Sequence, residues 1–297
     1  MKNITSIVVG VDYSPCSQTA LRQAVRLGKT LRAQVRAIHV IDTLVMVQTA
    51  DEMTALQQQI VASLLEESRA MWGDFAMRAG ADSVPLHIEI GSPTAGIARF
   101  AREHKAELVV MGTHGAGPSG RGTGTVASSV VRRCPGKVLL VQDAQAAAFR
   151  KVVAAIDFSP TSKEAYEQAI NIAAMDGASL HVVYVYSPPW DHMKQKAGAP
   201  EASPDFREAY AGALQQRMSS FCEAGRPEGV WAKPEFHAVP HKNHGQGIIE
   251  TAKRVGADLV VLGTHGATGL REVLLGSTAE RVVRDAHCSI LAIHPAK

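Results

Sequence analysis

The chain has 297 residues, of which 46% are hydrophobic and 20% charged, and its formal net charge at pH 7 is +3. This composition is typical of a soluble globular protein, and the length suits two domains of ordinary size. Because lysines and arginines are scattered rather than run together, a nucleic acid is not expected as the main partner.

Strand and helix patterns alternate along the first half of the chain. The first helix has a clear start signal, with the hydroxyl of Ser14 as N-cap and Pro15 at the first helical position. We expect Gly80 to end the long second helix, because glycine commonly ends helices. The predicted strands cover residues 4–11, 35–41, 84–90, 107–112 and 137–141, and the predicted helices cover 15–31, 51–79, 94–104 and 124–133.

The second half repeats this order. The segment ELVVMGTHGA at 107–116 returns as DLVVLGTHGA at 258–267 with two differences, so the duplication predicts two domains, residues 1–145 and 146–297. A segment at 187–204, rich in proline, alanine and charge, is expected to be a mobile insertion. The predicted strands cover residues 151–157, 179–186, 231–239, 258–263 and 289–293, and the predicted helices cover 161–175, 205–222, 247–255 and 276–286.

The strand sequences indicate where a ligand would bind. Runs such as LVVM and LVVL are apolar throughout, which indicates parallel sheets covered on both faces. Ligands of such sheets bind at the carboxyl ends of the strands, where the strand order reverses. Asp12 and Asp157 end the first strand of each half, and Gly112 and Gly263 end the fourth. We therefore expect the first and fourth strands to flank the ligand crevice.

A glycine-rich loop follows the fourth strand of the second half. It runs from Gly263-Thr-His-Gly266 over nine residues to Gly276-Ser277-Thr278, where a helix opens. The arrangement suits a phosphate group, because glycines let the backbone approach a ligand and take positive φ, while the helix start presents unpaired N–H groups and its positive dipole end. Glycines that only form turns are the alternative. The chain has no GxxxxGK[ST] P-loop, and no GxGxxG follows its first strand.

These residues resemble the universal stress protein family in its tandem two-domain form. The family pattern is a G-2x-G-9x-G-[ST] loop after the fourth strand and an aspartate at the end of the first, and related features recur in both halves. The resemblance implies an α/β fold of two Rossmann-like domains, similar to adenine nucleotide alpha hydrolases, each with a five-stranded parallel sheet of order 3-2-1-4-5 between helices. One subgroup of the family binds ATP in this loop, and the other lacks both loop and nucleotide.

The second half matches the ATP-binding subgroup. The resemblance implies that Ala155, Ile156 and Asp157 surround the adenine and that Val185 contacts it through the backbone. The ribose and phosphates would be held by Gly263, His265, Gly266, Gly276, Ser277 and Thr278. ATP would be the cofactor, accompanied by Mg²⁺ or Mn²⁺. A turn or helix N-cap role for Asp157 is the alternative.

The first half departs from the pattern, because only eight residues separate Gly115 from Gly124. A frame that takes Thr125 as the third position restores nine residues but loses the glycine. The corresponding nucleotide-binding set is Val11, Asp12, Val40, Gly112, His114, Gly115, Gly124 and Thr125. Whether this first set binds nucleotide is left open by the loop spacing.

The histidines outside this pattern have simpler interpretations. Three fall within eight residues, in the segment HAVPHKNH: His237, His241 and His244. Pro240 breaks any helix that would align them, and no cysteine or carboxylate completes a metal set nearby, so we interpret them as a polar loop. For His114 and His265 we expect a backbone-orienting or phosphate-contacting role, since no nucleophile or acid is visible beside them.

Two apolar features bear on partners. The final strands of the halves, VLLV at 138–141 and ILAI at 290–293, are expected at sheet edges. The family dimerises through this strand, so the resemblance implies an intramolecular pseudo-dimer, with a homodimer as a further option. An apolar stripe on the 51–79 helix is interpreted as core packing rather than a partner groove; its members are Met53, Leu56, Ile60, Leu64 and Met71.

The function implied is an ATP-binding regulator of the stress response that acts on an unidentified regulatory protein. The loop offers backbone and hydroxyl groups but no catalytic lysine or metal-binding carboxylate pair, so we expect at most slow ATP hydrolysis, no catalytic residues and no protein-bound metal. A scaffold without nucleotide and an adenylating enzyme are the alternatives.

The expected location is the cytoplasm. No apolar stretch approaches about 18 residues, and the N-terminus lacks the length and cleavage site of a signal peptide. The four cysteines form no C-x-x-C pair, and free buried thiols in a reducing compartment explain them most simply.

Overall fold

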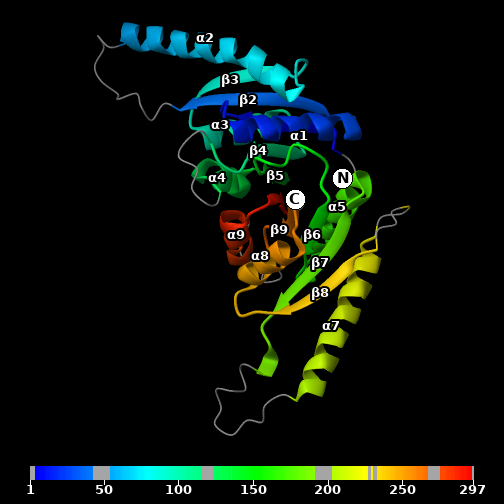
Figure 1. Ribbon diagram of the computed structural model, residues 1–297. Helices are drawn as coiled ribbons and strands as arrows, with labels where there is room; N and C mark the ends of the chain where they lie inside the picture. Colours follow the sequence, from blue (N-terminus) through cyan, green and yellow to red (C-terminus); the bar gives the residue numbers. More distant parts are fainter. Residues whose placement is uncertain are drawn as a thin grey trace. The chain divides into compact units, whose positions relative to one another are not determined.

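The computed structural model describes residues 4–42, 54–115, 123–134, 136–190, 203–226, 229, 233–266 and 275–295. The chain forms two units, Asn3–Ala147 and Ala148–Lys297. Each unit contains five parallel strands with helices between them (Figure 1). No helix in the described ranges is both long and apolar enough to cross a membrane.

The first unit has the predicted strand order 3-2-1-4-5. Its strands lie in the order β3-β2-β1-β4-β5, and all neighbours pair in parallel. The strand order therefore reverses between β1 and β4, as expected. The strands are β1 (Ser6–Val11), β2 (Gln34–Asp42), β3 (Leu86–Gly91), β4 (Leu108–Gly112) and β5 (Lys137–Val141), and the helices are α1 (Pro15–Leu31), α2 (Thr54–Ala79), α3 (Pro93–Glu103) and α4 (Thr125–Arg133).

The second unit repeats this order as β8-β7-β6-β9-β10, again with parallel pairing throughout. The predicted α/β class with two tandem domains is thus confirmed. The strands are β6 (Lys151–Ala155), β7 (Ser179–Tyr186), β8 (Glu235–Pro240), β9 (Leu259–Gly263) and β10 (Ser289–Ile293), and the helices are α5 (Pro160–Asp176), α7 (Pro204–Ala224), α8 (His244–Val255) and α9 (Ser277–Asp285).

Local capping explains where several helices begin. Ser14 Oγ accepts a hydrogen bond from the Ser17 N–H at 3.1 Å, with Pro15 following as predicted. The second unit repeats the motif, since Ser159 Oγ accepts from the Ser162 N–H at 3.1 Å. Helix α8 begins three residues before the predicted start at 247, because the Asn243 side chain caps it.

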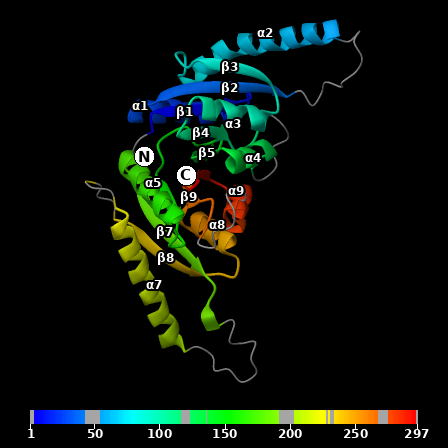
Figure 2. The same ribbon diagram turned by 180° about the vertical axis from the view of Figure 1, so that it is seen from behind.

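Helices cover both faces of each sheet (Figures 1 and 2). In the first unit α1 packs with α2, while α3 packs with α4; in the second unit the corresponding pairs are α5 with α7 and α8 with α9. Because both faces are covered, every residue of β1 and β4 is buried. This burial explains why these strands are apolar throughout rather than alternating.

The stripe on α2 is not the core contact that the sequence predicted. Ile60 is 44% exposed and Met71 45% exposed, whereas Phe75 and Ala76 near the end of the helix are buried. Ser68 contacts Tyr13 between these two positions, while the side chains of Ile60, before it, and Met71, after it, are left partly in solvent. Leu64 is half-buried. Met53 and the side chain of Leu56 lie outside the described residues, as do residues 191–202 of the predicted insertion.

All four cysteines are free and buried, as predicted. Burial raises the pKa of the Cys16 thiol from 9.0 to about 11. Burial raises the pKa values of Cys134, Cys222 and Cys288 from 9.0 to about 12. The thiols therefore ionise near pH 9 in the unfolded chain but keep their protons to higher pH in the native protein.

We expect the free energy of unfolding to fall as the pH rises above about 9, because the unfolded chain then binds fewer protons than the native protein. Each thiol contributes up to about 1.4 kcal/mol per pH unit between its unfolded and folded pKa values. Urea unfolding in reducing buffer at a series of pH values measures this slope. Cys134→Ala removes one thiol and should reduce it; a free energy that stays level up to about pH 10 would contradict the effect of thiol burial.

Candidate functional site

The sequence-predicted residues of the first unit lie around one cavity of about 380 Å³ at the carboxyl ends of β1, β2 and β4. We call it the first cleft. The polypeptide segments that reach it are far apart in the sequence, but the strand order brings their ends together. All of the predicted set line it: Val11, Asp12, Val40, Gly112, His114, Gly115, Gly124 and Thr125.

The predicted residues of the second unit lie around an equivalent cavity of about 170 Å³, the second cleft. It is formed by the ends of β6, β7 and β9 and by the start of α9. The whole predicted set again lines it: Ala155, Ile156, Asp157, Val185, Gly263, His265, Gly266, Gly276, Ser277 and Thr278. The structure thus brings each set together, while its role in binding remains a prediction.

The first cleft is the larger one, although its loop departs from the family spacing. Ligand pockets commonly enclose about 300–1,000 Å³, a range that includes the first cleft but not the second. Among the lining positions that differ in size, Gly10 in the first cleft corresponds to Ala155, and Pro93 corresponds to His244. The loop residues 116–122 and 267–274, which carry the spacing difference, lie outside the described residues.

The aspartate at the end of each first strand forms a turn and also lines the cleft. Asp157 Oδ1 accepts from the Ser159 N–H at 3.0 Å, and Phe158 between them takes a left-handed φ of 64°. The first unit repeats this turn with Tyr13 at φ 62°. Such φ values are uncommon for residues other than glycine. The turn leaves Asp157 Oδ2 directed at Gly266, so the turn and binding interpretations of this residue are compatible.

The loop glycines are needed for close packing, not for positive φ as the sequence suggested. None of the described glycines that line the two clefts has a positive φ. A Cβ on Gly112 would lie 2.8 Å from Cys16 Sγ, and one on Gly263 would lie 2.9 Å from Thr161 Cγ2. A Cβ on Gly266 would lie 2.8 Å from Asp157 Oδ2. Glycine therefore lets the end of the fourth strand approach the first helix and the aspartate turn.

Two helices open into the clefts at their N-termini. Gly124 and Gly276 occupy the N-cap positions of α4 and α9, and neither has a side chain to bond the first N–H groups. Thr125 and Ser277, the first residues of these helices, line the clefts. The free N–H groups and the positive end of the helix dipole make such a position suitable for an anion.

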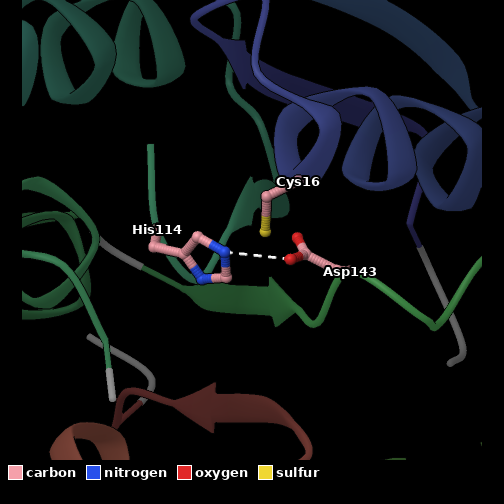
Figure 3. Close-up of side chains that lie close together, drawn as sticks. All are labelled: Cys16, His114 and Asp143. Atoms are coloured by element: carbon pink, nitrogen blue, oxygen red, sulfur yellow. Dashed lines mark hydrogen bonds and ion pairs between the residues drawn. The ribbon is translucent and has the colours of Figure 1, made fainter. Parts of the chain in front are cut away.

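His114 has an acidic neighbour that the sequence pattern did not reveal. Its Nε2 lies 3.0 Å from Asp143 Oδ2, its Nδ1 lies 3.1 Å from Thr113 Oγ1, and the Cys16 thiol points toward the same group (Figure 3). The expectation that no acid or nucleophile lies beside His114 was wrong, because Asp143 and Cys16 are distant in the chain and meet only through the order of β1, β4 and β5.

The Cys16 thiol is not a ready nucleophile. Burial raises its pKa to about 11, and the nearby carboxylate of Asp143 adds to the shift. Since the thiolate is the reactive form, a thiol with this pKa is protonated near neutral pH. His114, which lines the first cleft, is held there by its contacts with Thr113 and Asp143.

His265 occupies the equivalent position in the second cleft with different neighbours. Its Nδ1 lies 2.9 Å from Thr264 Oγ1, which also lies 3.2 Å from His294 Nδ1. Thr161 replaces the cysteine. His265 Nε2 is buried and has no hydrogen-bond partner in the described part of the chain. A buried imidazole nitrogen without a partner is uncommon in folded proteins, and this one belongs to a residue that lines the second cleft.

The histidines of HAVPHKNH do not form one group. His241 Nδ1 accepts from the Asn243 N–H at 2.9 Å, next to the cap of α8. His244 is the first residue of α8 and lines the second cleft, with its Nε2 3.4 Å from Ser187 Oγ. His241 therefore supports the turn at the start of α8, and His244 forms part of the wall of the second cleft.

His237 belongs to a different cluster. Its Nε2 lies 3.1 Å from His181 Nδ1, and the carboxylate of Glu235 is adjacent to both. The statement that no carboxylate lies nearby was wrong, and His181 was missed because it is on the neighbouring strand β7, 56 positions away. Glu235 lies two positions before His237 on the same strand, and only the strand register brings His181 to this pair.

Comparison with known proteins gives consistent matches to one family. The model of the universal stress protein family matches residues 3–142 and again residues 148–294. A universal stress protein of Mycolicibacterium smegmatis is 28% identical over 306 aligned positions, which cover 97% of each chain. Universal stress protein MJ0531 of Methanocaldococcus jannaschii is 34% identical over 152 positions, or 50% of this chain and 84% of its own. A universal stress protein structure from Archaeoglobus fulgidus shares the fold, with a TM-score of 0.67 at 17% identity over 98% of both chains.

We expect Gly112→Ala to lower the free energy of unfolding by about 1–3 kcal/mol, because the added methyl overpacks the contact with α1. It would lie 3.0 Å from the backbone carbon of Cys16, which cannot move aside like a flexible side chain. The matched control is Gly73→Ala in α2, where an added Cβ meets nothing within 4 Å. The control should gain about 0.5–1 kcal/mol as a better helix former. Equal stability of Gly112→Ala and wild type in urea unfolding would refute the packing argument.

Proposed function

Since the chain belongs to the universal stress protein family, we propose that its clefts bind adenine nucleotides, with ATP as the expected ligand, and that it acts as a nucleotide-dependent regulator of the stress response. One observation carries the proposal. In both units an aspartate turn, a closely packed glycine loop and an uncapped helix N-terminus meet at the point where the strand order reverses. This is the place where parallel α/β sheets hold their ligands.

The lining groups suit the parts of a nucleotide. Val185 and Ile156, together with the backbone at Ala155, offer an apolar edge for the adenine of the second cleft. Ser277 and Thr278 offer hydroxyl and N–H donors at the start of α9 for the phosphates. The first cleft supplies Val11 and Val40 for the base and Thr125 for the phosphates. A divalent ion such as Mg²⁺ or Mn²⁺ would be held mainly by the phosphates and would neutralise part of their charge.

The same groups favour binding over fast hydrolysis. Asp157 is the only carboxylate, and no lysine or arginine occurs, among the described residues that line the second cleft. Neutral donors that hold ground-state phosphates lower the free energy of the complex without specifically stabilising a transition state. We therefore propose at most slow ATP turnover.

A scaffold that acts through protein contacts is the second candidate. It is favoured for the second unit by the small volume of its cleft, about 170 Å³. A unit whose cleft binds no nucleotide would keep the family fold, but its interactions with other proteins would not depend on nucleotide.

We expect a negative charge at the cap of either helix to weaken ATP binding in that cleft at least about fivefold. Gly276→Asp and Gly124→Asp place a carboxylate where a phosphate would lie, and repulsion at about 4 Å costs roughly 1–4 kcal/mol between water-like and surface dielectric constants. The matched controls are Gly276→Asn and Gly124→Asn, which have nearly the same shape without the charge. Both aspartate and asparagine are good N-cap residues, so the fold should persist.

Calorimetry with ATP–Mg²⁺ on nucleotide-free protein gives the affinity and the number of sites. Two sites, each lost in its own aspartate variant and kept in the asparagine control, are expected. One site lost only in Gly124→Asp would assign binding to the first cleft alone. No binding, or binding unchanged in both aspartate variants, would reject the proposal and leave the scaffold.

A further inference from the structure

A compact group of two imidazoles and one carboxylate lies on β7 and β8 of the second unit. His181 is on β7, and Glu235 and His237 are on the neighbouring strand β8. In the parallel register His181 pairs with Glu235 and Val183 pairs with His237. Because side chains alternate along a strand, Glu235 and His237 point to one face of the sheet, and their contacts with His181 place all three there.

The donor atoms are spaced like the ligands of one metal ion. His181 Nδ1 and His237 Nε2 lie 3.1 Å apart. Glu235 Oε2 lies 3.4 Å from His181 Nδ1, and Glu235 Oε1 lies 3.5 Å from His237 Nε2. Ligands about 2.0–2.1 Å from a tetrahedral zinc ion lie roughly 3.3–3.4 Å from one another. The two imidazole nitrogens are therefore spaced close to this value, and each has one carboxylate oxygen at a similar distance.

We propose that His181, Glu235 and His237 bind a divalent transition-metal ion, with Zn²⁺ as the expected occupant. Two imidazole nitrogens and a carboxylate form a donor set that zinc prefers, and three protein ligands leave a fourth position for water or another small ligand. Copper and nickel accept the same donors, and copper binds such sites more tightly, so availability would decide between them.

The surroundings keep the imidazoles available as ligands. Both histidine side chains are 11% exposed, and burial lowers the pKa values of His181 and His237, which favours the neutral imidazole. Ser179 Oγ lies 3.4 Å from His181 Nε2, the nitrogen on the far side of the ring. Such an outer contact orients a metal-binding histidine.

The charge around the cluster is mixed. The positive charge of Lys151 is close to His181, and that of Arg254 is close to His237. Both charges repel a metal cation. The Nζ of Lys151 is occupied, since it donates to the Val255 carbonyl at 2.9 Å. Glu235 supplies the compensating negative charge, and because its side chain is 67% exposed, a hydrated ion can reach the group.

The first unit has the same backbone without the cluster. His87 stands on β3 where His237 stands on β8, since it pairs with Ile38 as His237 pairs with Val183. The position of His181 is taken by Arg36, and that of Glu235 by Pro85. A cation and a proline cannot ligate a metal ion. The set is therefore particular to the second unit, and the first unit provides an internal control.

The proposed metal site is separate from the nucleotide clefts. His181 is the third residue of β7, whereas Val185, further along the same strand, lines the second cleft. The metal site thus lies toward the amino ends of the strands and the cleft at their carboxyl ends. Failure of one proposal leaves the other intact.

The test uses the full-length protein after removal of metal with a chelator. Calorimetry with Zn²⁺ should show one site per chain, and His237→Ala and His181→Ala should each lower its affinity at least about 100-fold. Glu235→Gln should lower it about tenfold. Zn²⁺ should also raise the melting temperature of the wild type and not that of His237→Ala, because a ligand that binds only the native state stabilises it. Circular dichroism of the metal-free variants checks that they are folded.

Two control variants distinguish zinc bound at this cluster from zinc bound elsewhere on the chain. His87→Ala removes the counterpart histidine of the first unit and should leave zinc affinity unchanged. Cys16→Ser tests the cluster of Cys16, His114 and Asp143, whose donor atoms lie within 4.8 Å of one another. Co²⁺ bound by nitrogen and oxygen alone should lack the intense near-ultraviolet band of a cobalt–thiolate bond. If the protein binds no zinc, the contact between His181 and His237 is a simple hydrogen bond. If zinc binding is lost in Cys16→Ser but kept in His237→Ala, the metal lies at the first cleft. Either result overturns the proposal.

Discussion

The close approach of the fourth strand to the first helix is the contact on which each cleft depends. Gly112 lies against Cys16 in the first unit, and Gly263 lies against Thr161 in the second, at distances that leave no room for a Cβ. This contact holds the end of β4 or β9 beside the aspartate turn that follows β1 or β6. Without it the glycine loop, the turn and the following helix start would not share one crevice. Gly112 and Gly263 thus have a packing role, and the shape of each cleft depends on that packing.

The two units show how one backbone carries different chemistry. The parallel sheets have the same strand order, and both clefts are lined by equivalent positions. Their polar neighbours differ, since His114 meets Asp143 while His265 has a buried nitrogen without a partner in the described ranges. The cluster of His181, Glu235 and His237 likewise occurs in one unit only. Buried strands constrain the backbone of both copies, whereas side chains at strand ends can diverge because little packing depends on them.

The two proposed sites lie at opposite ends of the strands of the second unit. The carboxyl ends carry the clefts for which we propose adenine nucleotides, and the amino ends of β7 and β8 carry the group for which we propose a metal ion. The two sites share only strand β7, on which His181 and Val185 lie four positions apart. The two sites can be tested independently, since no residue is shared between them.

The sequence by itself determined the duplication, the alternation of strands and helices, the start of α1 at its serine cap, and part of the lining of both clefts. These follow from local rules: burial of apolar strands on two faces, capping, and the meeting of strand ends in a parallel sheet. Only the tertiary structure decided which residues distant in the chain lie together. It placed Asp143 beside His114 and His181 beside His237. It also left the side chains of Ile60 and Met71 on α2 partly exposed to solvent. The physical reason is that strand register and helix docking depend on long-range packing, which no local pattern of residues encodes.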